Sequence, residues 1–266
     1  MSPRLFVLLF PLILTACAHA IPNVEAPVTA ADSRSEAAAW QHAQQLVLVV
    51  SNDWNSTQGK LHRFQRVANG WQQIGEQADV MLGRNGSAWG LGLNALPRTD
   101  GPIKREGDGR APAGVFTIGT AFGYAGSANT GLPYQAMTAD DWCIDVPASD
   151  WYNKIIDRSV VKAPFLDQSS EPMRRDIHVQ GDIRYREGFV IEHNVDGKAR
   201  QGGSCIFAHL WQAPGETTAG CTAMAPESME ALLGWLDSKQ TPVFVLLPKA
   251  QYNALQQAWQ LPEISP

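Results

Sequence analysis

Short runs of apolar and β-branched residues, separated by turn residues, occupy the chain up to about residue 220, which predicts a mainly β fold. Residues 46–50 read LVLVV and indicate a buried strand. Asn69 and Gly70 lie between the strand-like segments 64–67 and 71–74. Because Asn-Gly is the preferred two-residue turn between antiparallel strands, this stretch predicts a β-hairpin.

The same signals continue further along the chain. Residues 84–86 read RNG and predict a second turn of this kind. Strands are expected at 114–123 and 188–194, where glycines punctuate the apolar runs.

The segment 204–210 (SCIFAHL) predicts one more strand. Successive side chains of a strand point to opposite faces, so Cys205, Phe207 and His209 should share one face. His209 is therefore expected at the end of a strand, where a loop begins.

After residue 225 the hydrophobic period changes. Apolar residues at i, i+3, i+4 and i+7 from Met229 onward predict an amphipathic helix, and Pro226 suits its first turn. Residues 241–248 (TPVFVLLP) predict a final buried strand. We find no internal repeat and no sign of a second domain.

The N-terminus carries an export signal. The apolar run 5–14 is too short to span a bilayer but has the size of a signal-peptide core. Residues 14–17 (LTAC) look like a bacterial lipobox that would lipidate Cys17, whereas 18–20 (AHA) would release a soluble protein. We favour the lipobox because the apolar run stops only two residues before Cys17.

The expected organisation is a signal peptide with the lipobox cysteine (1–17), a flexible tether (18–45), one folded domain (46–250) and a C-terminal tail (251–266). The tether is rich in Ala, Ser, Pro and Glu and lacks a strand pattern. We expect a periplasmic protein anchored to the outer membrane through Cys17.

Composition adds little beyond this. The chain has 266 residues, 44% of them hydrophobic, which suits one domain with a substantial core. Its formal net charge is −5, so there is no electrostatic reason to expect nucleic acid as a partner.

The number of cysteines is more informative about function. With Cys17 assigned to the signal region, Cys143, Cys205 and Cys221 remain, and an odd number in an oxidising compartment leaves one thiol unpaired. We expect Cys221 to be free and Cys143 and Cys205 to be bonded to each other or buried. A bond between Cys205 and Cys221 is the alternative, because Cys205 shares a face with His209.

Cys221 lies in the small-residue stretch TTAGCTAM, and His209 is 12 positions upstream. A cysteine nucleophile needs a base that makes the thiolate and N–H groups that stabilise the oxyanion. Cys221 could instead be a buried small hydrophobe, and the spacing alone does not decide between these readings.

Four longer stretches settle the interpretation. They are GSCIFAHLWQAPGETTAGCTAM (203–224), KREGDGRAPAGVFTIGTAFG (104–123), DWCIDVPASDWYN (141–153) and YREGFVIEHN (185–194). Together they make the chain resemble the YkuD-like L,D-transpeptidase catalytic domain family, which acts on bacterial peptidoglycan. The resemblance implies the fold of that family, a mainly β structure with a few helices in which the strands form a β-sandwich.

By this resemblance Cys221 is the nucleophile and His209 the base. Thr218 matches the Ser or Thr that opens the family motif, while Gly220 and the backbone amide of Cys221 would form the oxyanion hole. Thr222, next to the nucleophile, is included among the substrate-binding candidates.

The sequence also departs from the family. The stretch between His209 and Thr218 is shorter than usual, so the lid over the site should differ. Ala223 stands where the family often has Arg or Asn, which leaves open how the carboxylate of the donor is held. Arg105, Arg110 and Arg174 are the candidates for that role.

The implied reaction forms an acyl-enzyme on a peptidoglycan stem peptide. Transfer to an amine gives a cross-link, and transfer to water makes the enzyme an L,D-carboxypeptidase or endopeptidase. A non-catalytic envelope-binding lipoprotein is the alternative from another class. We expect a monomer without a cofactor.

We expect structural roles for the remaining polar residues that could have belonged to a site. We expect His193 to be structural, and Glu106 and Asp108 to form salt bridges with nearby arginines. His178 with Asp182 would suit zinc, but no third ligand has convincing spacing, so no metal is expected.

Overall fold

The computed structural model describes residues 37–95 and 98–264. The expected signal peptide, the lipobox with Cys17 and most of the expected tether lie outside these residues. Within them, none of the helices combines the length and the apolar character needed to cross a bilayer.

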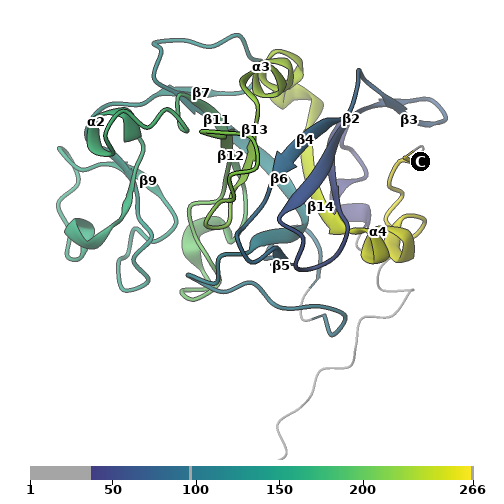
Figure 1. The fold of residues 1–266 in the computed structure, drawn as a ribbon, viewed down its shortest axis with the longest axis horizontal. Coiled ribbons are helices and arrows are strands. Elements are labelled where there is room, and N and C mark those ends of the chain that lie inside the picture. Colours follow the sequence, from purple (N-terminus) through teal and green to yellow (C-terminus); the bar gives the residue numbers. More distant parts are fainter. Residues whose placement is uncertain (1–36, 96–97, 265–266) are drawn as a thin grey trace, which may run out of the picture.

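Strands make up most of the regular structure (Figure 1). They are β1 (Gln45–Ser51), β2 (Gln58–Val67), β3 (Gly70–Gln73), β4 (Ala78–Met81), β5 (Ser87–Trp89), β6 (Ala111–Gly123), β7 (Tyr134–Ala136), β8 (Asp141–Cys143), β9 (Ile155–Asp157), β10 (Glu171–Pro172), β11 (Glu187–Ile191), β12 (Phe207–Leu210), β13 (Thr222–Met224) and β14 (Val243–Pro248). The α-helices are α2 (Arg175–His178), α3 (Pro226–Trp235) and α4 (Lys249–Leu255), and short 3₁₀ turns cover Ala37–Trp40, Leu166–Gln168, Val195–Gly197 and Ser238–Gln240.

Eight strands pair in a closed ring, in the order β1, β14, β6, β11, β12, β13, β4 and β2. The ring closes because β2 pairs with β4 through its first residues and with β1 along the length of β1. The fold is mainly β, as expected, but these pairings form a closed eight-stranded barrel and not two separate stacked sheets. Closure leaves the strands of the ring without a free edge.

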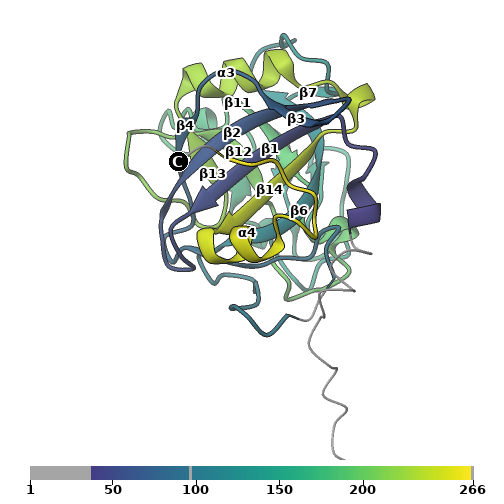
Figure 2. The ribbon, with the colours of Figure 1, turned by 90° about the vertical axis from the view of Figure 1, so that its right-hand side faces the viewer.

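The main hydrophobic core joins β1, β14 and β6 to the apolar faces of α3 and α4. Figure 2 shows α3 lying across one end of the strands and α4 near the other end of β14. Met229, Leu232 and Leu233 of α3 are buried, as the helical period predicts.

The folded domain extends beyond 46–250 at both ends. Trp40 donates its indole N–H to the carbonyl oxygen of Trp259, 3.2 Å away, and the two rings meet edge to face at 5.3 Å. The ring of Trp89 also packs edge to face against Trp259, with 6.3 Å between the ring centroids. Burial of these aromatic rings explains why residues 37–45 and 251–264 pack on the barrel instead of extending as tether and tail.

Most expected elements are present. Val67 pairs with Gly70, which gives the predicted hairpin between β2 and β3. The RNG turn closes through a hydrogen bond from the N–H of Gly86 to the oxygen of Gly83, 2.8 Å long. The strand expected at 204–210 begins only at Phe207, because Cys205 adopts a left-handed φ of 54°, which interrupts extended backbone.

A second, three-stranded sheet of β8, β9 and β10 lies beside the barrel, at the left of Figure 1 near α2. The small sheet supplies Glu171 to the cavity described below, and Asp145 and Arg175 reach it from the segments that follow β8 and β10.

Candidate active site

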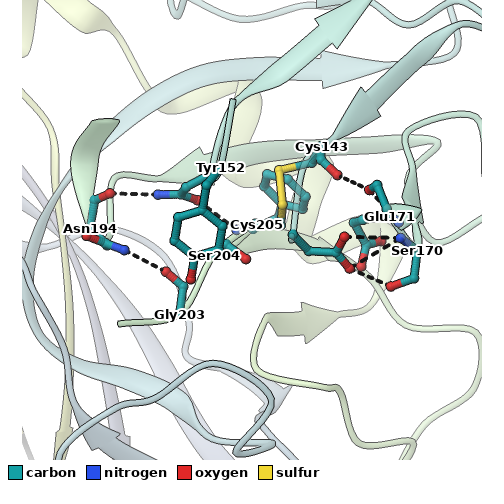
Figure 3. The surroundings of a disulfide bond; sticks show 12 residues. Cys143, Tyr152, Ser170, Glu171, Asn194, Gly203, Ser204 and Cys205 are labelled. Atoms are coloured by element: carbon teal, nitrogen blue, oxygen red, sulfur yellow. Dashed lines mark hydrogen bonds between the residues drawn. A yellow bond between two sulfur atoms is a disulfide. The ribbon is translucent and has the colours of Figure 1, made fainter. Parts of the chain in front are cut away.

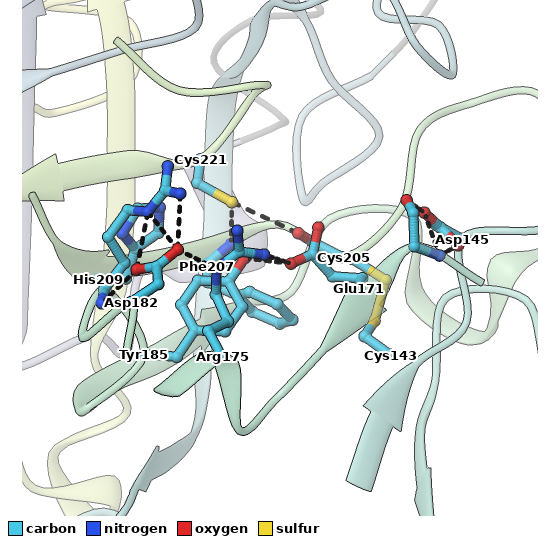
Figure 4. Close-up of polar contacts among 12 residues, drawn as sticks. Cys143, Asp145, Glu171, Arg175, Asp182, Tyr185, Cys205, Phe207, His209 and Cys221 are labelled. Atoms are coloured by element: carbon cyan, nitrogen blue, oxygen red, sulfur yellow. Dashed lines mark hydrogen bonds and ion pairs between the residues drawn. A yellow bond between two sulfur atoms is a disulfide. The ribbon is translucent and has the colours of Figure 1, made fainter. Parts of the chain in front are cut away.

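Two parallel strands place Cys221 and His209 at the same cavity. In the pairing of β12 with β13, Ala208 is opposite Thr222 and His209 is opposite Ala223. Cys221 directly precedes β13 and lies beside Phe207, whose N–H donates to Sγ of Cys221 at 3.4 Å. The thiol of Cys221 donates in turn to the carbonyl oxygen of Cys205, also at 3.4 Å (Figure 4).

Thr218 holds the turn that carries the cysteine. Its hydroxyl donates to the carbonyl oxygen of Cys221 at 2.6 Å and accepts from the N–H of Gly220 at 3.1 Å. Gly220 has a φ of 155°, and a Cβ there would lie 3.0 Å from the oxygen of Arg110. This turn therefore depends on a hydroxyl side chain at position 218 and on the glycine at position 220.

The hydrogen bonds of the turn bear on the expected oxyanion hole. The N–H of Gly220 is already bonded to Thr218, whereas the N–H of Cys221 has no acceptor among the described residues. Thr222 is buried in β13 and, by the alternation of a strand, points away from the side chain of Cys221. Of the expected oxyanion donors, the amide of Cys221 is the one left free.

His209 is held in one orientation. Its Nδ1 lies 2.7 Å from the carbonyl oxygen of Leu210, so Nδ1 must carry a hydrogen, and in the neutral ring Nε2 is then the acceptor. The ring of Tyr185 packs edge-on against the imidazole, with 5.2 Å between centroids. This is the tautomer that a proton acceptor requires.

Burial keeps both groups uncharged. It lowers the pKa of His209 to about 4, against the smaller opposing effect of the hydrogen bond with Leu210. It raises the pKa of the Cys221 thiol to about 12, and the nearby charge of Glu171 acts in the same direction. At neutral pH the pair is therefore a thiol and a neutral imidazole.

Both residues line one cavity of about 340 Å³. Its wall carries side chains of both charges: the basic ones are Arg84, Lys104, Arg175 and Arg184, and the acidic ones are Glu106, Asp145 and Glu171. A cavity with charges of both signs suits a ligand that itself carries ammonium and carboxylate groups.

A partly buried network connects three of these charged residues, Glu171, Arg175 and Arg184, through Asp182 (Figure 4). The carboxylate of Asp182 forms ion pairs with Arg175 at 2.7 Å and with Arg184 at 2.6 Å. Burial opposes the ionisation of Asp182, but hydrogen bonds from the two arginines outweigh it and lower its pKa to about 2. Tyr185 donates to Glu171 at 2.7 Å, and burial raises the pKa of Glu171 despite this bond.

Cys143 and Cys205 form a disulfide with their Cα atoms 5.9 Å apart, and Cys221 is a free cysteine (Figure 3). The first of the two pairings considered from the sequence is therefore the one present, and the bond between Cys205 and Cys221 is not. The disulfide ties β8 of the small sheet to Cys205, two residues before β12. Asn153 adds a second tie, because its side-chain oxygen accepts from the N–H of Cys205 at 2.8 Å.

A family model described as the YkuD L,D-transpeptidase catalytic domain matches residues 60–245. The chain belongs to this family. Neither a curated protein nor a solved structure matches the chain. Membership supports a function in peptidoglycan, because the domain belongs to cysteine-dependent L,D-transpeptidases.

Within this L,D-transpeptidase domain, the three arginines expected to hold a carboxylate do not line the cavity. The guanidinium of Arg110 donates to the carbonyl oxygens of Trp54 and Ser87, both at 2.9 Å. Arg174 pairs with Asp176 at 2.7 Å. Arg105 is exposed outside the cavity. The structure thus does not support Arg105 and Arg110 as substrate contacts.

The L,D-transpeptidase cavity contains charged residues that the sequence did not single out. Arg84, Glu171 and Arg175 reach it from the RNG turn, from β10 and from α2. Arg84 was visible only as part of a turn signal. No local pattern indicates that these segments meet at Cys221, because their approach depends on strand pairing and on the docking of the small sheet.

The other histidines and the acidic residues lie as follows. His193 is buried, accepts from the N–H of Leu91 at 3.1 Å and bonds the oxygen of Gly202 at 2.8 Å, so it ties two loops together. Asp108 pairs with Lys104 at 2.6 Å, and Glu106 accepts from Ser204 and Tyr152, so among the described residues neither carboxylate forms the salt bridge with an arginine that the sequence predicted. In 37–95 and 98–264, no three His, Cys, Asp or Glu side chains are grouped to hold a metal ion.

Proposed function

We propose that this L,D-transpeptidase-family chain is a cysteine acyltransferase acting on peptidoglycan stem peptides. Cys221 attacks the carbonyl of the diamino acid that is joined to the terminal D-residue, and the D-residue leaves. An acceptor then takes the acyl group from the sulfur. The observation that carries this proposal is that a free cysteine and a histidine with a fixed tautomer line the same cavity.

The first step starts from uncharged groups. As Sγ of Cys221 bonds to the carbonyl carbon, the thiol proton moves to Nε2 of His209. The negative charge that develops on the carbonyl oxygen is stabilised by the free N–H of Cys221. When the C–N bond breaks, the departing amine takes the proton from Nε2, which leaves a thioester and a neutral imidazole.

In the second step His209 again takes up a proton and then returns it, but now between the acceptor and the sulfur. His209 accepts a proton from the acceptor as it attacks the thioester, and returns the proton to Sγ of Cys221 as the sulfur leaves. An amine of a neighbouring stem gives a cross-link, and water gives a shortened stem. Both outcomes need only the groups already named.

The decisive experiment is incubation of the purified protein with disaccharide-tetrapeptide muropeptides. Intact mass should show an acyl-enzyme on Cys221 that is missing in Cys221→Ala. Cross-linked dimers among the products identify a transpeptidase, and tripeptides identify a carboxypeptidase. If the wild type forms no adduct and all stems remain intact, the alternative of a non-catalytic binding lipoprotein replaces the enzyme.

We also propose that the protein works in the periplasm as an outer-membrane lipoprotein. Support comes from the lipobox at 14–17 and from the disulfide, which belongs to an oxidising compartment. Ala18, and not Asp, follows Cys17, which favours the outer membrane. Cys17→Ser should abolish both lipidation and membrane fractionation, whereas an unmodified N-terminus at Ile21 contradicts the anchor.

A further inference from the structure

One basic side chain of the cavity differs from the other three. Lys104 is paired with Asp108 at 2.6 Å, and Arg175 and Arg184 are both paired with Asp182. Arg84 lines the same cavity, is exposed, and has no acidic or hydrogen-bonding partner for its guanidinium among the described residues. It is therefore the cation of this wall that is free to bind an anionic ligand.

The backbone fixes Arg84 next to the cysteine turn. Its N–H donates to the oxygen of Thr218 at 2.8 Å, and the N–H of Thr218 donates to the oxygen of Leu82 at 2.9 Å. These bonds join the RNG turn to the residue that positions Cys221. The two segments therefore act as one rigid unit, although 134 residues separate Arg84 from Thr218 in the chain.

The path of the side chain is also defined. A Cβ placed on Gly109 would lie 3.0 Å from Nε and 3.1 Å from Cγ of Arg84, so the arginine crosses the bare Cα of Gly109. Asn85, its neighbour in the turn, is fixed to the same loop by a hydrogen bond from its N–H to the oxygen of Gly109, 2.9 Å long. The position of Arg84 therefore depends on a glycine in the loop between β5 and β6.

We propose that Arg84 binds the C-terminal carboxylate of the donor stem peptide and so directs Cys221 to the last peptide bond. This inference rests on the proposed function. The carboxylate of a single leaving residue lies within about one residue length, ~3.6 Å, of the bond that breaks. A cation that recognises it must therefore border the nucleophile turn, as Arg84 does, and a planar guanidinium matches a carboxylate with two parallel hydrogen bonds.

The proposal also fits the departure at Ala223. That position follows Cys221 by two residues and offers no side chain that binds a carboxylate. Arg84 supplies a cation to the same turn from a different strand connection. An internal peptide bond has no carboxylate at this position, so Arg84 favours donors that end one residue after the diamino acid.

The test uses two synthetic stem tetrapeptides, one with a free C-terminal carboxylate and one with a C-terminal carboxamide. The rate of Cys221 acylation is followed by intact mass. The wild type should prefer the free acid by roughly 10- to 100-fold, the size expected for a charge-assisted hydrogen bond. Arg84→Gln should abolish this preference by slowing only the free acid, and Arg84→Lys should retain part of it.

Arg105→Gln is the matched control, because it removes the same charge from an exposed position outside the cavity. It should leave the acid-to-amide ratio unchanged. An equal loss for both peptides in Arg84→Gln overturns the proposal, because it would mean that Arg84 only maintains the cysteine turn. An unchanged ratio in Arg84→Gln overturns it as well.

A second readout does not depend on peptidoglycan. Cys221 is alkylated with iodoacetate, which is anionic, and with iodoacetamide, which is neutral. Arg84→Gln should lower the iodoacetate-to-iodoacetamide rate ratio, and Arg105→Gln should not. If the wild type forms no acyl-enzyme with any stem, the proposed function fails, while this ratio still decides whether Arg84 attracts a carboxylate to Cys221.

Discussion

The thiol of Cys221 donates a hydrogen bond to the main-chain oxygen of Cys205, 3.4 Å away. Cys205 is held in its left-handed conformation between a disulfide to Cys143 and a hydrogen bond to Asn153. The sulfur that we propose as nucleophile is therefore positioned by a residue of the structural disulfide. This relationship links the small sheet to the chemistry of the barrel.

Removal of the disulfide should lower both the stability of the protein and the rate at which Cys221 is acylated. In Cys143→Ser/Cys205→Ser the free energy of unfolding should fall by roughly 2–4 kcal/mol, because the unfolded chain regains the freedom of a long loop. The carbonyl of residue 205 should also become less well fixed against Cys221. Urea denaturation and the acylation rate measure the two effects, and an unchanged unfolding midpoint would contradict the first.

His209→Ala should separate reactivity from folding. We expect turnover to fall by roughly 10²–10⁴-fold, because the thiol of Cys221, with a pKa near 12, loses its proton acceptor. His193→Ala is the control: it removes a buried residue that ties two loops, so it should lower the unfolding midpoint more than turnover. A folded His193→Ala without turnover, together with an active His209→Ala, would reverse the assignment of the base.

The sequence predicted the parts of this site that lie close together in the chain. Cys221, His209 and Thr218 fall within one stretch, and the register of β12 and β13 brings them to one cavity. Their uncharged resting state was not predictable, because it follows from burial by Tyr185 and the small sheet. The free cysteine followed from an odd count, whereas the pairing of the other two needed the structure.

Features that depend on contacts between distant segments could not be predicted from the sequence either. The sheet signals located most strands, but closure of the barrel depends on β2 pairing with two neighbours, which no local pattern encodes. Arg84 reaches the cavity only because its turn binds the backbone of Thr218. Arg110 looked available in the sequence, yet its guanidinium is occupied by main-chain carbonyl groups.

The buried histidines should make stability depend on pH. The pKa of both His209 and His193 is lowered to about 4 in the folded state, below the usual value of 6.5. Between these values the unfolded chain binds more protons, so stability is complete above about pH 6.5 and falls as the pH drops toward 4. Burial lowers the pKa of His62 in the same direction, whereas the raised pKa of Glu171 acts in the opposite direction.

The expected loss over this window is roughly 2–5 kcal/mol, measured as the change in urea unfolding free energy between pH 7 and pH 4.5. His42→Gln, at an exposed position, should leave the profile unchanged. A flat profile across the window would contradict the burial of neutral imidazoles.

Asp182→Asn should affect stability and specificity together. It removes the carboxylate that Arg175 and Arg184 share, and leaves Arg175 with Glu171, 3.2 Å away, and Arg184 with Glu216, 3.6 Å away, as their remaining ion pairs. We expect a loss of roughly 2–4 kcal/mol, near the lower end for breaking a buried pair because both arginines retain some contact with water. Asp79→Asn is the matched control, since its ion pair with Lys60 is exposed and should contribute at most about 1 kcal/mol.

The same substitution tests how the cavity selects its ligand. With Asp182 neutral, Arg175 and Arg184 each keep one other carboxylate partner but lose the one they share, so their positive charge in the cavity is less fully balanced and attracts anions. Asp182→Asn should therefore raise iodoacetate labelling of Cys221 relative to iodoacetamide, while Asp79→Asn leaves the ratio as in the wild type. A lower ratio in folded Asp182→Asn would mean that the paired arginines already attract anions and that Asp182 does not restrain them.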